Sequence, residues 1–355
     1  MAAPDRRVLH ILPHPGGGGE TYVQALEAVD GYVVTRAFLA TSARIRMPTP
    51  RVVSGVVGVN RGASRYDLVH VHGEVAGTLS LPALARNPSV LTLHGLNLLR
   101  RVAGPLAAAA RANLRAIIGA ADRTICVTQA EVDEIGAVDT RLGAKCVLIP
   151  NGVDLPPLAT GIERKGARAA LGIADETVLA LWVGTLDKPK QPHVAIRAVI
   201  AGARRDVPLH LAIVGAGPLR EEAELAAADN TSVITFLGHR DDVRPLLAAA
   251  DVFVLSSLRE GLPFSLLEAM AMGLPAVVAA SGGMEDVVAG AGIAVRPGDE
   301  SGLTDALTTL AAEPVLRARL GRTARARAAD DFGVAQMRAR TREVYERVLR
   351  KRQGT

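Results

Sequence analysis

Short apolar runs of the kind that form buried strands recur along the whole chain, and helical patterns fall between most of them. A strand, a helix and a second strand in succession favour a parallel sheet with right-handed crossovers. Twelve such runs, six in each half, therefore predict two doubly wound α/β units. The predicted strands are 7–12, 32–39, 67–71, 90–93, 123–127, 146–149, 178–183, 209–214, 233–237, 252–255, 276–279 and 293–295.

The segment Asn151-Gly-Val-Asp-Leu-Pro-Pro157 breaks this alternation. Its glycine and its two consecutive prolines end one unit and begin a linker, which we place at about 150–165. A chain of 355 residues has the length of about two domains. We therefore expect a first domain over 1–155 and a second over 156–334, followed by one long charged helical pattern at the C-terminus.

Charge is modest: 41 basic and 36 acidic residues, of which 16 and 12 lie in residues 1–154. This bias suits an anionic surface or acceptor near the first half, but it is too weak to predict a nucleic-acid partner. Arg outnumbers Lys 36 to 5, so Lys188 and Lys190 stand out in their loop.

No apolar run approaches the roughly 18 residues that a membrane span needs, and Val8–Leu12 is too short for a signal peptide. We expect a cytoplasmic protein, a monomer or a homodimer. Cys126 and Cys146 then fit buried free thiols better than a disulfide or a metal pair.

The second half contains a strand-to-helix segment with two glutamates. Pro263 suits the first helical position and Gly273 the helix end, so Gly261–Ser265 would lie at a helix N-terminus, which favours phosphate. Glu260 and Glu268 could accept hydrogen bonds from sugar hydroxyls. The alternative is a capped helix with two solvated glutamates.

The string Glu260-Gly-Leu-Pro-Phe-Ser-Leu-Leu-Glu268-Ala-Met-Ala resembles the E-x7-E signature of retaining glycosyltransferases of family 4. The resemblance implies the GT-B fold, in which two Rossmann-like doubly wound parallel-sheet domains face each other across a cleft. It also implies that the N-terminal domain binds the acceptor and the second domain the nucleotide-sugar donor. The C-terminal helix, at about 335–355, would return to the first domain.

The loop Leu181–Pro192 resembles the family's G-R-L-x(3)-K-G segment, whose Arg and Lys hold the donor diphosphate. Lys190 takes the Lys position, but Thr185 replaces the usual Arg and Gln191 the usual Gly. A lost charge-assisted hydrogen bond costs about 1.5–3 kcal/mol. Lys188, or the helix end after Glu260, could take over the phosphate contact of the missing Arg. The alternative for both lysines is a solvated loop without a ligand.

Three further segments resemble donor-side elements of the family. The Gly215 and Gly217 turn is expected to shape a strand-to-helix connection, and 281–286 to pack on the donor side. His239 and Arg240 follow a strand where the family's loop meets the nucleobase. The expected donor set is Gly18, Gly19, Thr185, Lys190, His239, Arg240, Glu260, Gly261, Leu262, Pro263, Ser265 and Glu268.

The first predicted strand leads into His14-Pro-Gly-Gly-Gly-Gly-Glu20, with a helix from about Thr21. Glycines before a helix let a ligand approach the backbone, although a plain surface turn explains them too. The spacing does not fit a dinucleotide fingerprint. The family's first loop, which this segment resembles, meets donor phosphate and acceptor.

Histidines 70, 72 and 94 end strands, where a structural histidine is the common alternative to a functional one. Ligands bind just past strand ends, which favours His72 and His94 over His70. A metal is a poor explanation, because no carboxylate or Cys cluster completes a coordination shell. The resemblance assigns His94, in Thr-x-His-Gly, to the donor sugar.

Residues 96–102 come next, and three interpretations are open: an acceptor lid, a basic face that makes a peripheral membrane contact, or a solvated helix. The expected acceptor-binding residues are His14, Glu20, His72 and Asn97.

The resemblance implies a metal-independent, retaining transfer of a sugar from a UDP- or GDP-sugar to a small-molecule, natural-product, lipid or saccharide acceptor. No Asp-x-Asp stands out to hold a metal, and no cofactor is expected. The expected catalytic residues are His94, Glu260 and Lys190. The alternatives are a non-catalytic nucleotide-sugar binder and another GT-B enzyme, such as an epimerase or a phosphorylase.

Overall fold

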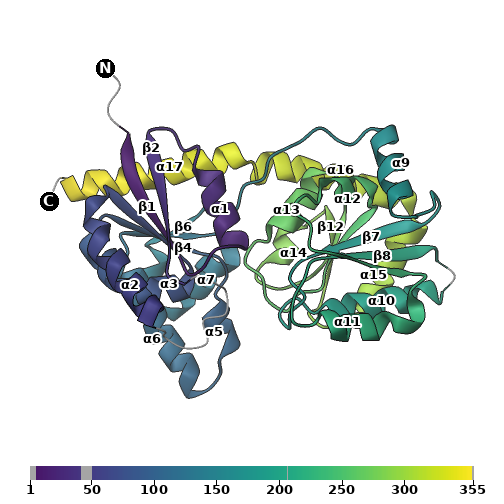
Figure 1. The fold of residues 1–355 in the computed structure, drawn as a ribbon, viewed down its shortest axis with the longest axis horizontal. Helices are drawn as coiled ribbons and strands as arrows, with labels where there is room; N and C mark the ends of the chain where they lie inside the picture. Colours follow the sequence, from purple (N-terminus) through teal and green to yellow (C-terminus); the bar gives the residue numbers. More distant parts are fainter. Residues whose placement is uncertain (1–4, 41–49, 206, 354–355) are drawn as a thin grey trace. The chain divides into compact units, whose positions relative to one another are not determined.

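The computed structural model describes residues 5–40, 50–205 and 207–353. Its contacts divide the chain into two compact units, Met1–Gly152 with Val334–Thr355, and Val153–Gly333 (Figure 1). The sequence placed these boundaries at 155 and 335. The first unit is therefore built from both ends of the chain.

The first unit contains a six-stranded parallel sheet in the order β2-β1-β3-β4-β5-β6. Its apolar core lies between the sheet and the helices that cover it. The strands are β1 (Arg6–Leu12), β2 (Tyr32–Phe38), β3 (Leu68–His72), β4 (Ser89–Leu93), β5 (Arg123–Cys126) and β6 (Cys146–Leu148). The helices are α1 (Gly18–Leu26), α2 (Pro50–Gly62), α3 (Gly73–Leu79), α4 (Leu81–Arg86), α5 (Asn97–Arg101), α6 (Pro105–Ala120), α7 (Gln129–Val138), α8 (Thr140–Gly143) and α17 (Val334–Gln353).

Helix α17, yellow in Figure 1, completes the first unit although it is the last element of the chain. It packs against α1 and β4. Val344, Tyr345, Val348 and Leu349 on one side of this helix are buried. At its start Arg338 donates a hydrogen bond to the carbonyl of Ala25 at 2.6 Å.

The second unit contains another six-stranded parallel sheet, in the order β12-β11-β10-β7-β8-β9. Its core gathers around Trp182, which is 1% exposed. The strands are β7 (Val178–Val183), β8 (Leu209–Val214), β9 (Ile234–Gly238), β10 (Val252–Leu255), β11 (Ala276–Ala279) and β12 (Gly292–Val295). The helices are α9 (Gly161–Ala170), α10 (Pro192–Ala203), α11 (Arg220–Ala227), α12 (Arg244–Ala249), α13 (Phe264–Ala271), α14 (Met284–Val287), α15 (Glu300–Ala312) and α16 (Pro314–Asp331).

All twelve predicted strands are present, and each end lies within one residue of its predicted place. Strands buried on both faces read as short uninterrupted apolar runs, which makes them easy to recognise. Two helix starts differ from the prediction. Helix α1 begins at Gly18 rather than near Thr21, because Gly16 and Gly17, with φ of 84° and 77°, already make the turn. Pro263 has an extended ψ of 132° and precedes α13 instead of opening it.

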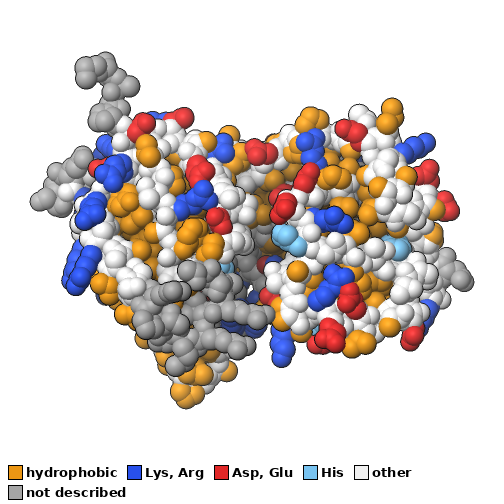
Figure 2. All heavy atoms as spheres, in the orientation of Figure 1, with side chains coloured by type: hydrophobic (Ala, Val, Ile, Leu, Met, Phe, Trp, Pro, Cys, Tyr) orange, Lys and Arg blue, Asp and Glu red, His pale blue; other side chains and the backbone are white. Residues whose placement is uncertain are grey.

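Cys126 and Cys146 lie on neighbouring strands and are free thiols. On the face drawn in Figure 2, basic side chains are interspersed with acidic ones on both units. Among the described residues no helix is both long and apolar enough to cross a membrane.

Candidate functional site

In the second unit, the turn after β10 leads directly into the N-terminus of α13. Gly261 and Leu262 are buried, and Pro263 precedes the first helical residue. The first backbone N–H groups of a helix have no partner within the helix, and the helix dipole makes this end favourable for an anion. Ser265, in the first turn, donates a 3.4 Å hydrogen bond to the carbonyl of Val183.

Lys190 and Glu260 form an ion pair beside this helix start. Lys190 Nζ lies 2.6 Å from Glu260 Oε1, and the two side chains are 23% and 8% exposed. The sequence assigned the lysine to phosphate and the glutamate to sugar hydroxyls, and the structure brings these two residues together. Their opposite charges neutralise each other where a charged ligand would have to bind.

The loop that carries Lys190 is held in place by Ser256. Its hydroxyl accepts a hydrogen bond from Trp182 Nε1 at 3.1 Å and reaches the carbonyl oxygens of Lys190 and Gln191 at 3.0 and 2.9 Å. Gln191, at a position where the family has Gly, adopts a left-handed conformation with φ of 46°. This conformation costs a non-glycine residue about 1–2 kcal/mol. The loop thus keeps a backbone shape suited to Gly despite the substitution.

Close backbone contact explains the glycines of the next loop. A Cβ atom on Gly215 would lie 1.8 Å from the carbonyl oxygen of Gly184, and one on Gly217 would lie 2.4 Å from that of Leu186. No side chain fits at these distances. The two glycines therefore let the two loops touch, in agreement with their predicted role in the turn, while Thr185 remains exposed.

The remaining donor-side residues lie at the carboxyl end of β9 and along α13. His239 and Arg240 are exposed, and His239 Nε2 lies 3.3 Å from Asp241 Oδ1. Burial, with a smaller contribution from Asp242, raises the pKa of Glu268 above its usual value. The described contacts leave His239 and Arg240 available at the surface for a ligand.

In the first unit, His10, His70, His72 and His94 form one cluster. His10 and His70 are neighbours in the paired strands β1 and β3, and His72 follows at the end of β3. The first three are buried, whereas His94, just after β4, is partly exposed. The sequence analysis did not select His10, because it lies in the middle of an apolar strand.

Hydrogen bonds link these rings into a chain that starts at Tyr345 of α17. The Tyr345 hydroxyl lies 2.6 Å from His70 Nδ1 and 3.4 Å from His10 Nε2. His10 Nδ1 then lies 2.9 Å from His72 Nε2, and His72 Nδ1 lies 3.2 Å from His94 Nε2. The chain thus runs from the core to His94.

Burial keeps all four imidazoles neutral near pH 7. It lowers the pKa of His10 to about 3 and that of His94 to about 4. The pKa values of His70 and His72 are also lowered well below 6.5, first by burial and then by the neighbouring rings. Candidate ligand atoms of His10, His70 and His72 lie within 4.8 Å of one another, a grouping absent from the sequence prediction. Each of their ring nitrogens has a hydrogen-bond partner, including Thr92 Oγ1 at 2.6 Å from His70 Nε2, and the expectation of no metal stays a prediction.

His72 is 1% exposed and is bonded on both ring nitrogens, so it lies behind His94 and not at a surface open to an acceptor. This arrangement differs from the acceptor contact expected of His72. Asn97 begins α5, where the next amide, that of Leu98, donates to Glu74 Oε2 at 2.7 Å. Burial raises the pKa of Glu74.

The β1–α1 loop places Gly18 and Gly19 in the first turn of α1, where their amides resemble those of α13. Glu20 in the same turn is engaged within the protein, since it forms an ion pair with Arg36 at 3.1 Å and accepts a hydrogen bond from the amide of Gly16. His14 Nδ1 lies 2.9 Å from its neighbour's carbonyl oxygen. A direct role of Glu20 at an acceptor would require it to leave this pair.

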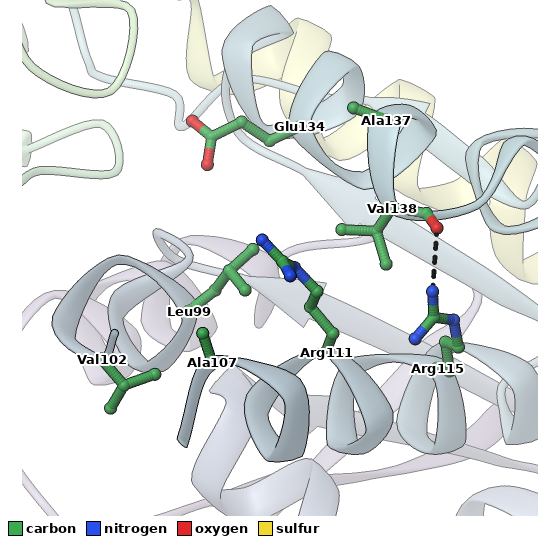
Figure 3. A pocket seen from close by; sticks show the side chains of 8 residues that line it. All are labelled: Leu99, Val102, Ala107, Arg111, Arg115, Glu134, Ala137 and Val138. Carbon is green, nitrogen blue, oxygen red and sulfur yellow. Dashed lines mark hydrogen bonds between the residues drawn. The ribbon is translucent and has the colours of Figure 1, made fainter. Parts of the chain in front are cut away.

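A hollow of about 460 Å³ lies between α5, α6 and α7 (Figure 3). Figure 3 shows Arg111 extending from α6 toward the helix that carries Glu134. Glu134 is paired with Arg100 at 2.6 Å, and Arg115 donates to the carbonyl of Val138 at 3.1 Å. Arg111 has no ion-pair partner among the described residues. The lining residues are Leu99, Val102, Ala107, Arg111, Arg115, Glu134, Ala137 and Val138.

Comparisons with known proteins agree with these two units. Residues 8–156 match the family described as Glycosyltransferase Family 4, and residues 177–313 match Glycosyl transferases group 1. The solved structure of Anabaena Alr3699/HepE in complex with UDP-glucose covers 96% of this chain and 99% of its own, with a TM-score of 0.82 and 22% identity. That of WaaG, a glycosyltransferase involved in lipopolysaccharide biosynthesis, covers 95% and 99%, with a TM-score of 0.76 and 18% identity.

Two Rossmann-like units with these neighbours define the GT-B fold of glycosyltransferases. A D-inositol 3-phosphate glycosyltransferase of Actinosynnema mirum is 31% identical over 290 residues, which are 74% of this chain and 69% of that protein. The chain belongs to glycosyltransferase family 4.

The names of the relatives give two different acceptors. The Streptomyces avermitilis D-inositol 3-phosphate glycosyltransferase is 30% identical over 79% of this chain, and this chain spans 65% of its length. An Escherichia coli UDP-Gal:alpha-D-GlcNAc-diphosphoundecaprenol alpha-1,3-galactosyltransferase is 28% identical over 79% of this chain and 75% of its own length.

Proposed function

We propose that this protein is a retaining, metal-independent glycosyltransferase that uses a UDP-sugar. The observation that carries the proposal is the Lys190–Glu260 ion pair at the N-terminus of α13: a ligand would replace this pairing, with Lys190 turning to the diphosphate and Glu260 to the sugar hydroxyls beside the first amides of the helix. These are the groups that a sugar diphosphate needs. The choice of UDP over GDP is supported by the HepE complexes with UDP and UDP-glucose and by the UDP-Gal in the name of the Escherichia coli relative.

In this proposal the protein positions the substrates and stabilises charge on the leaving group. Lys190 and the first amides of α13 neutralise the diphosphate. Glu260 accepts hydrogen bonds from sugar hydroxyls, Glu268 accepts them from the ribose diol, and His94 accepts one from a substrate hydroxyl. The acceptor attacks on the face from which the diphosphate leaves, and a phosphate oxygen takes its proton, so the sugar keeps its anomeric configuration.

A thermal-shift screen followed by a nucleotide-release assay tests this proposal. UDP-glucose, UDP-galactose and UDP-N-acetylglucosamine are expected to raise the melting temperature more than GDP-mannose does, because ligand binding stabilises the folded state. The best donor should then release UDP when a suitable acceptor is added. Stabilisation without any release across an acceptor panel would favour the non-catalytic binder.

Activity is expected to persist in excess EDTA, because Lys190 and helix amides take the place of a divalent cation at the diphosphate. The measurement is UDP release with EDTA or with added Mg²⁺ or Mn²⁺, after metal analysis of the purified protein. Abolition of activity by EDTA, with recovery on adding a metal, would contradict the metal-independent scheme.

We further propose that the acceptor carries a negative charge and that Arg111 contacts it. The hollow beside Arg111 has apolar walls and two guanidinium groups, whereas Glu134 is already paired with Arg100. The acceptors named for the relatives, D-inositol 3-phosphate and a diphosphoundecaprenol-linked sugar, both contain phosphate.

Arg111→Ala is expected to raise the KM for a phosphorylated acceptor by about three- to fivefold, because an exposed charge pair contributes up to about 1 kcal/mol. The donor KM should not change. Arg86→Ala removes an arginine of α4 that is also exposed but does not line the hollow, and serves as the control. Equal effects of the two variants would contradict a specific contact.

A further inference from the structure

Between Tyr345 and His94, each neutral imidazole of the chain must donate at one nitrogen and accept at the other, because it carries one N–H. His72 contacts His10 through Nε2 and His94 through Nδ1. If His72 donates to one of these neighbours it must accept from the other, so both hydrogen bonds point the same way along the chain. The same holds for His10, which bonds Tyr345 and His72. The proton position on His94 is therefore coupled to that on His10.

Tyr345 determines the direction of these bonds. Its hydroxyl has one proton, and the two imidazole nitrogens in reach are His70 Nδ1 at 2.6 Å and His10 Nε2 at 3.4 Å. We assign the proton to the short bond, so that Tyr345 donates to His70 Nδ1 and not to His10 Nε2; the opposite assignment would reverse every bond of the chain. His70 then donates from Nε2 to Thr92 Oγ1, 2.6 Å away.

The remaining protons follow from this assignment. His10 must carry its proton on Nε2, where it faces the phenol oxygen, so its Nδ1 accepts from His72 Nε2. His72 Nδ1 is then an acceptor for His94 Nε2–H. His94 Nδ1 is left without a proton, and it has no hydrogen-bond partner among the described residues.

We infer that Tyr345, His10 and His72 are positioning residues that hold His94 in the tautomer with its proton on Nε2, so that Nδ1 accepts a hydrogen bond from a substrate hydroxyl. The substrate contact rests on the proposed function, whereas the tautomer does not. Helix α17 would thus act on the site through three rings without touching a ligand.

The tautomer can be measured in the ligand-free, full-length protein labelled with ¹⁵N-histidine. In the NMR spectrum, a ring nitrogen without a proton resonates well downfield of one that carries a proton, and the signals lost in His94→Gln identify His94. We expect a single His94 form with the proton on Nε2. A His94 proton on Nδ1 in the wild-type protein would overturn the inference.

Tyr345→Phe removes the hydroxyl and keeps the ring that packs against His70 at 5.6 Å. The direction of the bonds is then no longer fixed, so we expect a mixture of His94 tautomers and a two- to tenfold lower kcat with the best UDP-sugar, the range that one hydrogen bond provides. Tyr32→Phe is the matched control, because the Tyr32 ring packs against that of Tyr345 at 5.1 Å but its hydroxyl is not part of the chain.

An unchanged His94 spectrum in Tyr345→Phe, or an equal change in Tyr32→Phe, would overturn the inference. Neither result depends on turnover. A wild-type protein that shows the expected tautomer but never releases UDP would contradict the proposed function and leave the positioning by Tyr345 supported.

Discussion

Lys190→Ala and Glu260→Ala are each expected to lower turnover of the UDP-sugar between tenfold and a hundredfold. In the proposed mechanism each variant removes a charged partner of the reacting donor, and a charge-assisted hydrogen bond contributes about 1.5–3 kcal/mol. For the lysine the loss should appear mainly in kcat, because negative charge on the diphosphate increases as the sugar leaves. Steady-state kinetics by UDP release measures both parameters.

The two variants are expected to differ in stability. Removing Lys190 takes a cation away from a carboxylate that is 8% exposed, whereas removing Glu260 leaves a lysine that is 23% exposed and can reach water. Lys190→Ala should therefore lower the free energy of unfolding more, by about 1–3 kcal/mol. Denaturant unfolding separates this effect from the kinetic one, and both proteins should remain folded.

Arg205 and Asp305 provide a matched control in the same unit. They form an ion pair at 2.7 Å with side chains that are 49% and 60% exposed. Replacing either by Ala should change neither turnover nor stability appreciably, since exposed pairs contribute little. Full activity in both Lys190→Ala and Glu260→Ala would contradict the assignment of the site to α13.

Lowering the pH from about 7 to 5 is expected to reduce the stability of the first unit by several kcal/mol. The pKa values of His10, His70, His72 and His94 are all depressed by burial, to about 3 for His10 and about 4 for His94. In the unfolded chain these groups titrate near pH 6.5. Below that pH the unfolded state binds more protons, so stability falls by about 1.4 kcal/mol per pH unit for each group.

One buried acid, Glu131, makes the protein more stable as the pH falls. Burial raises the pKa of Glu131 to about 7, so the folded state holds an extra proton between roughly pH 4.3 and 7. The stability from this group is present at low pH and is lost as the pH rises through 7. It offsets only about one of the four histidines, so the net trend remains a loss of stability on acidification.

Denaturant unfolding at pH 7 and at pH 5 measures this trend. His10→Gln should reduce the pH dependence, because one buried titrating group is removed. A wild-type protein with the same unfolding free energy at both pH values would show that the four rings are not held neutral in the folded state.

The sequence analysis located the strands well, but it missed how the sites are assembled. It placed Lys190 and Glu260 in one donor site but did not predict their ion pair, which forms because β7 lies beside β10 and brings together residues 70 positions apart. His10 looked like an interior strand residue until the β1–β3 register placed it opposite His70. Tyr345 carried no motif at all, since its partner is 275 residues away. Contacts of this kind depend on topology and not on local pattern.

Because α17 belongs to the first unit, it also affects the order in which the two units can fold during synthesis. A ribosome produces residues 153–333 as one uninterrupted stretch, so the second unit can close its core as soon as that stretch emerges. The first unit, although translated earlier, must wait for Val344, Tyr345, Val348 and Leu349 to fill its interior. The half of the protein that is made first therefore matures last.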